Sequence, residues 1–202
     1  MSEFFLELFS EEIPSSLQKN LREELLDSFN KTFNEKFISF KKSSSYSTPN
    51  RLIIVFEGLQ KQVVLKSKEI KGPNINAPEI ALEGFMKSNN ISNKDLIKKK
   101  IDKGEFYFFK TKSKKLNTHD LLEEFVPLLL QKIQWKKSMR WGEFDLNWGR
   151  PLKSILAMFD KKKLTFNFHH LVSSNTTFID KEFEENKKIF NDFKEYVNFF
   201  KK

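Results

Sequence analysis

The residues with the clearest chemical potential lie in two neighbouring segments, residues 136–142 (Lys-Lys-Ser-Met-Arg-Trp-Gly) and 148–151 (Trp-Gly-Arg-Pro). They contain Arg140, Trp141 and Arg150, in a chain that has 32 Lys but only four Arg and three Trp. Arg carries a planar fork that grips a phosphate or carboxylate with two hydrogen bonds and stacks on aromatic rings, which Lys cannot do. The pattern indicates binding of an anionic ligand. The structural alternative is that the Trp residues fill a core while both Arg residues cap nearby carbonyl groups.

The composition points to a basic protein without disulfide or metal chemistry. The chain has 202 residues, a net charge of +9 and a pI of about 9.5. A basic surface favours polyanions such as nucleic acid, although a Lys-rich and Phe-rich composition is also typical of an AT-rich genome. The absence of Cys excludes disulfides and thiolate metal sites and fits a reducing compartment. With only three His, no metal site is expected.

Neither a membrane span nor a secretion signal is expected. No apolar run approaches the roughly 20 residues that cross a bilayer. Residues 1–10 alternate acidic and apolar residues and lack the basic start and the cleavage site of a signal peptide.

Hydrophobic periodicity predicts the elements of the first part of the chain. A short apolar run predicts a buried strand over residues 3–10. Pro14 suits the first turn of a helix, and apolar residues then recur every four positions through Phe33, which predicts one buried helix face. β-branched residues predict a strand over 52–56, with residues 62–70 as its hairpin partner.

The remaining elements alternate less regularly. Asn117 or Thr118 can cap a long helix, which Pro127 should kink or divide. The expected elements are a loop over 74–78, a helix over 78–88, a strand over 106–109, a helix from 117 or 118 to about 133, and a hairpin of 152–159 with 163–168.

Strands and helices without regular alternation predict an α+β fold, with mixed antiparallel sheet elements, packed helices and two small subdomains. The expected boundaries place a strand–helix–hairpin subdomain at residues 1–70 and an α+β subdomain with the Ser-Met-Arg-Trp-Gly and Arg-Pro motifs at 71–180. Residues 181–202 are expected to form a helical tail, which ends without a cap and so reads as truncated.

The sequence contains no recognisable catalytic motif. Six scattered Gly residues form neither a P-loop nor a dinucleotide fingerprint, and no Ser lies in a nucleophile elbow. Glu11 and Glu12 are adjacent acids at a helix start, where carboxylates more often complement the helix dipole than perform catalysis.

Several short motifs, in order, resemble the β subunit of bacterial glycyl-tRNA synthetase. The resemblance covers roughly residues 3–178, and the chain resembles only the N-terminal piece of that subunit. The matching segments are 3–14 (a strand, Glu-Glu and Pro), 48–52 (Thr-Pro-Asn-Arg-Leu), 71–73 (Lys-Gly-Pro), 81–85 (Ala-Leu-Glu-Gly-Phe), 103–105 (Lys-Gly-Glu), 137–142 (Lys-Ser-Met-Arg-Trp-Gly) and 150–152 (Arg-Pro-Leu). The chain departs from the family at Asn50, where Arg is usual, and at residues 178–181, where Gly-His-Arg-Phe is usual.

The resemblance implies an accessory role in glycine–tRNA ligation. In this family a separate alpha subunit uses ATP and Mg²⁺ to activate glycine, and the beta subunit binds tRNA in a cytoplasmic hetero-oligomer. The resemblance therefore implies a tRNA partner and an alpha-subunit partner, and it implies neither a cofactor nor catalytic residues in this chain. The alternatives are a free-standing basic RNA-binding module and a purely structural domain.

Within that resemblance, six residues are the expected tRNA contacts. They are Arg51, Lys71, Arg140, Trp141, Arg150 and Lys153. Arg51, Lys71, Arg140 and Arg150 lie at turns or strand ends, where side chains from separate elements converge, and are expected to form one contiguous basic surface. Trp141 is a candidate for stacking on a base.

Overall fold

The structure, a computed structural model, describes residues 2–65, 67–101, 104–180 and 186–201. The chain forms two compact units. Unit 1 combines Met1–Val63 with Asn117–Lys202, and unit 2 consists of Val64–Leu116. Both contain helices and small antiparallel sheets, which confirms the α+β class expected from the sequence.

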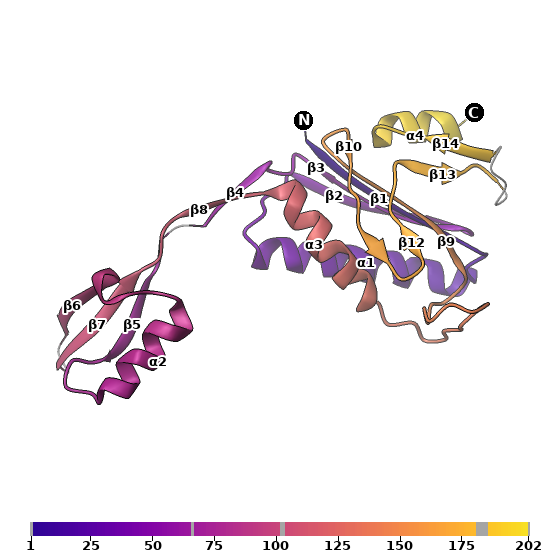
Figure 1. The fold of residues 1–202 in the computed structure, drawn as a ribbon. Helices are drawn as coiled ribbons and strands as arrows, with labels where there is room; N and C mark the ends of the chain where they lie inside the picture. Colours follow the sequence, from indigo (N-terminus) through magenta and orange to yellow (C-terminus); the bar gives the residue numbers. More distant parts are fainter. Residues whose placement is uncertain (1, 66, 102–103, 181–185, 202) are drawn as a thin grey trace. The chain divides into compact units, whose positions relative to one another are not determined.

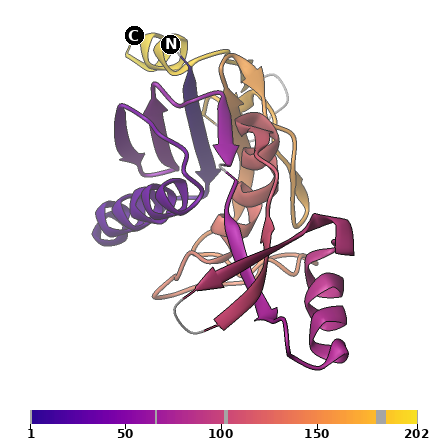
Figure 2. The same ribbon diagram turned by 90° about the vertical axis from the view of Figure 1, so that its left-hand side faces the viewer.

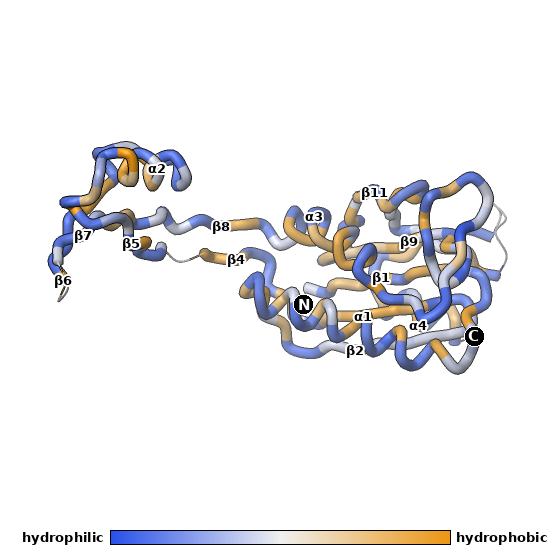
Figure 3. Tube along the Cα trace, turned by 90° about the horizontal axis from the view of Figure 1, so that it is seen from below, coloured by the Kyte–Doolittle hydropathy of each residue, from blue (hydrophilic) through white to orange (hydrophobic). Residues whose placement is uncertain are grey.

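Unit 1 is built on a five-stranded antiparallel sheet (Figure 1). Its strands follow the order β10 (Lys162–Lys163), β9 (Leu152–Phe159), β1 (Glu3–Ser10), β3 (Arg51–Glu57) and β2 (Lys42–Thr48). Strand β1 is central, since it pairs with β3 on one edge and with β9 on the other. Seven of its eight residues are buried, and much of β9 is hydrophobic (Figure 3). The strands expected over 3–10 and 52–56 are thereby confirmed.

Two long helices lie on the same side of this sheet (Figure 1). Helix α1 (Ser15–Glu35) follows Pro14 and buries the apolar face expected from its four-residue spacing. Helix α3 (Thr118–Gln131) is capped by Asn117, whose side chain accepts a hydrogen bond from the His119 N–H, and it runs uninterrupted past Pro127. In the described part of the chain, no helix is long and apolar enough to cross a membrane.

Phe residues form the core between these helices and the sheet. Phe4 of β1 lies 5.6 Å from Phe29 of α1, measured between ring centroids, and Phe33 lies 4.6 Å from Phe56 of β3. Phe125 of α3 completes the cluster at 5.7 Å from Phe33. Because most of these pairs are tilted or edge-to-face, each adds about 0.5–1.5 kcal/mol beyond the burial of its area.

The opposite side of the sheet is covered by the C-terminal part of the chain. Helix α4 (Phe193–Phe200) packs Tyr196 against Phe5 of β1, with 5.0 Å between ring centroids. Strand β13 (Thr176–Phe178) pairs with β14 (Lys187–Ile189) just before this helix. The tail expected as helical is therefore a strand followed by a helix, and residues 181–185 lie outside the described residues.

Between β9 and β13 the chain forms two tight connections. Strand β10 pairs back on β9 through a turn at Asp160 and Lys161, whose φ angles are +49° and +65°. This is the hairpin expected after residue 159, although β10 is shorter than the expected second strand. Strands β11 (Asn167–Phe168) and β12 (Leu171–Val172) form a second small hairpin.

Unit 2 contains a three-stranded antiparallel sheet in the order β5 (Glu69–Asn74), β7 (Gly104–Lys110) and β6 (Leu96–Ile101). Helix α2 (Glu79–Asn89) lies along this sheet (Figure 2), and a short 3-10 helix (Asn93–Asp95) precedes β6. The helix expected over 78–88 and the strand over 106–109 are confirmed. Among the described residues of this unit, none is fully buried.

Two strand assignments differ from the sequence expectation. Strand β4 (Gln62–Leu65) pairs with β8 (Lys114–Asn117) and not with β3, because both edges of β3 are already occupied by β1 and β2. The Ser-rich residues 43–45, for which the sequence predicts no strand, lie in β2. An edge strand with polar side chains gives no hydrophobic alternation that a sequence pattern can detect.

The division into units also differs from the expected boundaries. Residues 71–180, expected as one subdomain, are shared between the two units because β9 pairs with β1 rather than with strands nearer in sequence. Unit 2 is thus an insertion between two halves of unit 1.

The Phe cluster predicts a sharp contrast between two Phe residues near the same helix. Phe29 is completely buried, so Phe29→Ala should lower the free energy of unfolding by about 3–5 kcal/mol. Phe37, just after α1, is 65% exposed with a φ of +57°, a conformation that Asn tolerates better. Phe37→Asn should therefore change the free energy of unfolding by less than about 0.5 kcal/mol. Urea denaturation measures both, and equal losses would contradict this core.

Candidate nucleic-acid interface

Arg51, expected at a basic surface, is buried in unit 1 with 6% of its surface exposed. Its guanidinium is paired with Glu7 and donates 3.0 Å hydrogen bonds to the hydroxyl of Thr177 and the carbonyl of Ile179. The same group lies 4.5 Å above the ring of Phe9. The Arg51 guanidinium therefore forms contacts within the fold. The expectation that Arg51 lies on an exposed basic surface is wrong.

Tyr196 completes the surroundings of Glu7. Its hydroxyl donates a 2.8 Å hydrogen bond to the Glu7 Oε1 atom. Burial raises the pKa of Tyr196 well above its usual range, and the negative charge of Glu7 raises it further. The hydroxyl therefore stays protonated and remains a donor.

Arg150 and Lys153 lie where three of the short motifs meet, at one end of the five-stranded sheet. The Arg150 Nε donates to the carbonyl of Glu12 at 3.1 Å, and its Nη1 donates to the carbonyl of Gly149 at 2.9 Å. Lys153 pairs with Glu11 at 3.4 Å. Arg150 thus caps carbonyl groups, as in the structural alternative drawn from the sequence, although its side chain remains partly exposed.

Arg140 and Trp141 lie on an irregular segment between α3 and β9. The side chain of Arg140 is 64% exposed and forms a 2.8 Å ion pair with Asp145, itself 89% exposed. An exposed pair of this kind contributes about 1 kcal/mol at most, so Arg140 can exchange Asp145 for another anion. Gly142 follows with a φ of +56°, a conformation that suits Gly and turns the chain at this point.

The two Trp residues of the motif have different environments. Trp148 is buried against Trp135, with 5.0 Å between ring centroids. Gly149 lies directly under Trp135, where an added Cβ would come within 1.8 Å of the indole. Trp141 is only half-buried and meets His170 edge-on at 5.8 Å. Trp148 therefore belongs to the core, whereas part of Trp141 remains available at the surface.

Lys71 lies on β5 in unit 2, whereas the other five expected contacts belong to unit 1. The six expected contacts thus fall into four settings: Arg51 in the interior, Arg150 with Lys153 at the motif junction, Arg140 with Trp141 on the irregular segment, and Lys71 in unit 2. The single contiguous basic surface stays a prediction for the exposed members, and Arg51 does not contribute to it.

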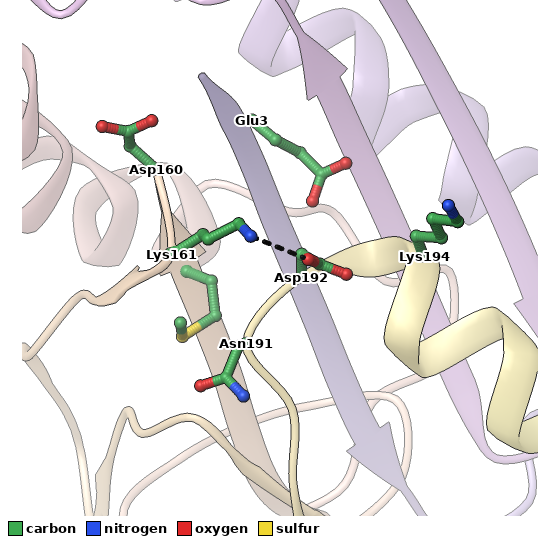
Figure 4. A pocket seen from close by; sticks show the side chains of 7 residues that line it. Glu3, Asp160, Lys161, Asn191, Asp192 and Lys194 are labelled. Atoms are coloured by element: carbon green, nitrogen blue, oxygen red, sulfur yellow. Dashed lines mark ion pairs between the residues drawn. The ribbon is translucent and has the colours of Figure 1, made fainter. Parts of the chain in front are cut away.

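One pocket of unit 1 was not anticipated from the sequence (Figure 4). It has a volume of about 140 Å³ and carries both acidic and basic side chains, including Glu3, Asp192 and Lys161. Lys161 pairs with Asp192 at 3.7 Å, and Glu3 accepts a 2.9 Å hydrogen bond from the Phe193 N–H. The ion pair and the hydrogen bond occupy part of the polar lining and tie the start of α4 to β1 and to the turn after β9.

Comparison with known proteins identifies clear relatives. The family model described as "Glycyl-tRNA synthetase beta subunit" matches residues 4–202. The glycine–tRNA ligase beta subunit of Rickettsia felis is 40% identical over 200 residues, which cover 98% of this chain and 30% of that protein. The corresponding subunits of Rickettsia prowazekii and Rickettsia bellii are 40% and 39% identical, and 30% of each is covered. The chain spans about 30% of the length of the curated relatives it matches.

The burial of Arg51 predicts a structural effect on mutation. Arg51→Met removes one partner of a buried ion pair and should lower the free energy of unfolding by about 3–5 kcal/mol. Arg140→Met makes the same substitution in an exposed pair and should cost about 1 kcal/mol or less. Chemical denaturation followed by circular dichroism compares the two. Similar losses in both variants would show that the Glu7–Arg51 pair is not buried as described.

Glu3 predicts a dependence of stability on pH. Burial raises the pKa of the Glu3 carboxyl, an effect that the Phe193 N–H opposes and that the Asp192 and Glu57 charges reinforce. The folded state therefore favours the protonated form, so this contribution is present below the unfolded pKa of about 4.3 and is lost as pH rises through the folded pKa. Glu3→Gln keeps the acceptor but cannot ionise. The free energy of unfolding of this variant, relative to that of the parent protein, should therefore increase between pH 4 and pH 7. A difference that stays constant over this range would contradict the raised pKa of Glu3.

Proposed function

The chain belongs to the glycyl-tRNA synthetase beta subunit family, and on that basis we propose that it supports the ATP-dependent attachment of glycine to its tRNA. The match over residues 4–202 carries this proposal. The curated relatives are named as beta subunits of glycine–tRNA ligase, and this chain corresponds to about 30% of their length. We propose that the role of this chain is to bind tRNA and to contribute to the assembly of the enzyme.

In this proposal the chemical step belongs to a separate alpha subunit in a cytoplasmic hetero-oligomer. The alpha subunit would bind ATP and Mg²⁺ and activate glycine, while this chain would hold no cofactor and no catalytic residue. The sequence supports that division of labour because its Gly residues form no phosphate-binding loop.

The exposed part of the motif segment is the proposed tRNA contact in unit 1. Arg140 is exposed and held only by an exposed carboxylate, so a phosphate can replace Asp145 at its guanidinium. Trp141 lies beside it with part of its ring accessible. Arg150 and Lys153 are secondary candidates, because each already contacts a carbonyl or a carboxylate of the same unit.

An RNA-binding module that works without an alpha subunit is the second candidate. It is favoured by the charge of unit 2, which has thirteen Lys against six acidic residues and so carries +7 of the net charge of +9. Such a concentration of positive charge attracts polyanions whether or not a partner subunit is present.

Two measurements separate these candidates. We expect the chain to copurify with an alpha subunit of the family and to bind tRNA with an affinity that falls steeply with salt, since phosphate contacts release counterions. Retained tRNA binding without copurification would favour the independent module. Loss of both would refute the proposed function.

Arg140 predicts a specific change in that salt dependence. Arg140→Ala should weaken tRNA binding and reduce the slope of log affinity against log salt by roughly 0.7 to 1, the contribution of one phosphate contact. Asp145→Asn is the matched control, because it removes the anion that competes for the same guanidinium. That variant should bind tRNA as tightly as the parent chain or more tightly. Unchanged affinity and slope in Arg140→Ala would remove this residue from the interface.

A further inference from the structure

The three-stranded sheet of unit 2 has two chemically different faces. Residues paired directly across antiparallel strands share a face, and neighbours along a strand alternate. Pairing of Phe108 with Lys71 and Ile97, and of Phe106 with Lys99, therefore places these five side chains on one face. We call it the open face.

Helix α2 covers the other face. Gly72 follows Lys71 and points to the opposite side of β5, where an added Cβ would come within 2.8 Å of the Phe85 ring of α2. The close approach of helix and strand at Gly72 fixes the helix on that side. The rings of Phe106 and Phe108 are on the side that α2 leaves uncovered.

Lysines surround the two rings of the open face. The Lys71 Nζ lies 3.6 Å from the centroid of Phe106, and the Lys99 Nζ lies 5.7 Å from that of Phe108. The two lysines belong to the strands on either side of β7, so the rings lie in a row between cations. Glu69 is the acidic member of this face and pairs with Lys99 at 2.7 Å.

The open face is incompletely covered by the chain itself. Phe106 and Phe108 are only partly buried, and Ile97 on the neighbouring strand is 44% exposed. Helix α2 contributes no buried residue. Apolar rings at a surface of this kind indicate a binding site rather than a core.

The charge of unit 2 identifies the kind of partner. The unit carries +7 in 53 residues, and three consecutive lysines, residues 98–100, lie in its strand β6. A basic protein surface would be repelled here and a neutral one would leave the lysines without counter-charges, whereas RNA supplies phosphates for the lysines and flat bases for the rings. Paired bases of an RNA helix do not expose their faces, so the ligand must contain unpaired nucleotides.

We propose that the open face of the β5–β7–β6 sheet binds unpaired nucleotides of RNA, with bases stacked on Phe106 and Phe108 and phosphates held by Lys71 and Lys99. A base must then replace the Lys71 ammonium above Phe106. An exposed cation–π contact is weaker than the stacking of a base on an aromatic ring, so the exchange is favourable and frees Lys71 for a phosphate. The inference rests on the proposed tRNA binding and names the feature of the RNA that unit 2 recognises.

The test uses the full chain and a fluorescently labelled oligouridylate of about twelve nucleotides, within the usual site sizes for single strands. Phe106→Leu and Phe108→Leu keep apolar bulk but remove the aromatic face. Each should weaken binding by about 5- to 150-fold in fluorescence anisotropy, the range that corresponds to one stacked base. A duplex RNA of the same length should bind the parent chain more weakly and should be little affected by either substitution.

Neighbouring lysines provide the matched control. Lys99→Ala removes a cation from the open face, and Lys98→Ala removes the same charge from the face of α2. Lys99→Ala should weaken oligouridylate binding more than Lys98→Ala does, and Glu69→Gln should strengthen it by removing the competing carboxylate. Circular dichroism of every variant establishes that unit 2 remains folded.

The outcomes separate this inference from the proposed function. If both Leu variants bind oligouridylate like the parent chain while tRNA binding still responds to Arg140→Ala, the open face is not the site and the tRNA role stands. If the chain binds neither oligouridylate nor tRNA, both proposals fail. If the Leu variants lose only their copurification with the alpha subunit, the open face docks protein and the RNA assignment is overturned.

Discussion

The carboxylate of Glu7 is buried in the middle of the central strand of unit 1, where an ionised group is stable only when charges and hydrogen bonds surround it. Arg51 comes from β3 and Tyr196 from α4, and both reach the same carboxylate. Arg51 in turn donates to the backbone carbonyls of Phe178 and Ile179. The buried charge of Glu7 thus requires β1, β3, the end of β13 and α4 to occupy fixed positions. The packing of α4 on its face of the sheet therefore depends on this one charge.

The two units distribute apolar area and charge in opposite ways. Unit 1 contains every fully buried residue among those described, including the Phe cluster around Phe33. Unit 2 holds most of the net charge and has no such core. The same residue type therefore serves two purposes: Phe29 and Phe33 stabilise the fold, whereas Phe106 and Phe108 lie on an uncovered sheet face. Composition alone cannot distinguish these roles, because only the pairing of strands shows which face each ring occupies.

Local pattern was enough to predict β1, β3, α1 and α3, since each has a strong apolar run or a regular apolar spacing. It failed for β2 and for the partner of β4, because strand pairing joins distant segments. The same limit affects the site. Arg51 lies in a recognisable motif, yet the motif cannot show that Glu7, 44 positions away, holds its guanidinium in the interior. Conversely, the exposed setting of Arg140 and the capping by Arg150 are both compatible with the sequence, and only the structure separates them.

The place of β1 in the sheet has a consequence for how the chain is made. β1 leaves the ribosome well before its partner β9, which begins only at Leu152. At a synthesis rate of about 5–20 residues per second, the edge of β1 that pairs with β9 stays unpaired for roughly 8–30 s. During this interval one of the most apolar strands of the chain has an unpaired edge, the kind of edge that promotes association between chains. Unit 2 is synthesised before β9, so its lysines are already present on the nascent chain while this edge is unpaired. Their positive charge repels other nascent chains until β9 pairs with β1.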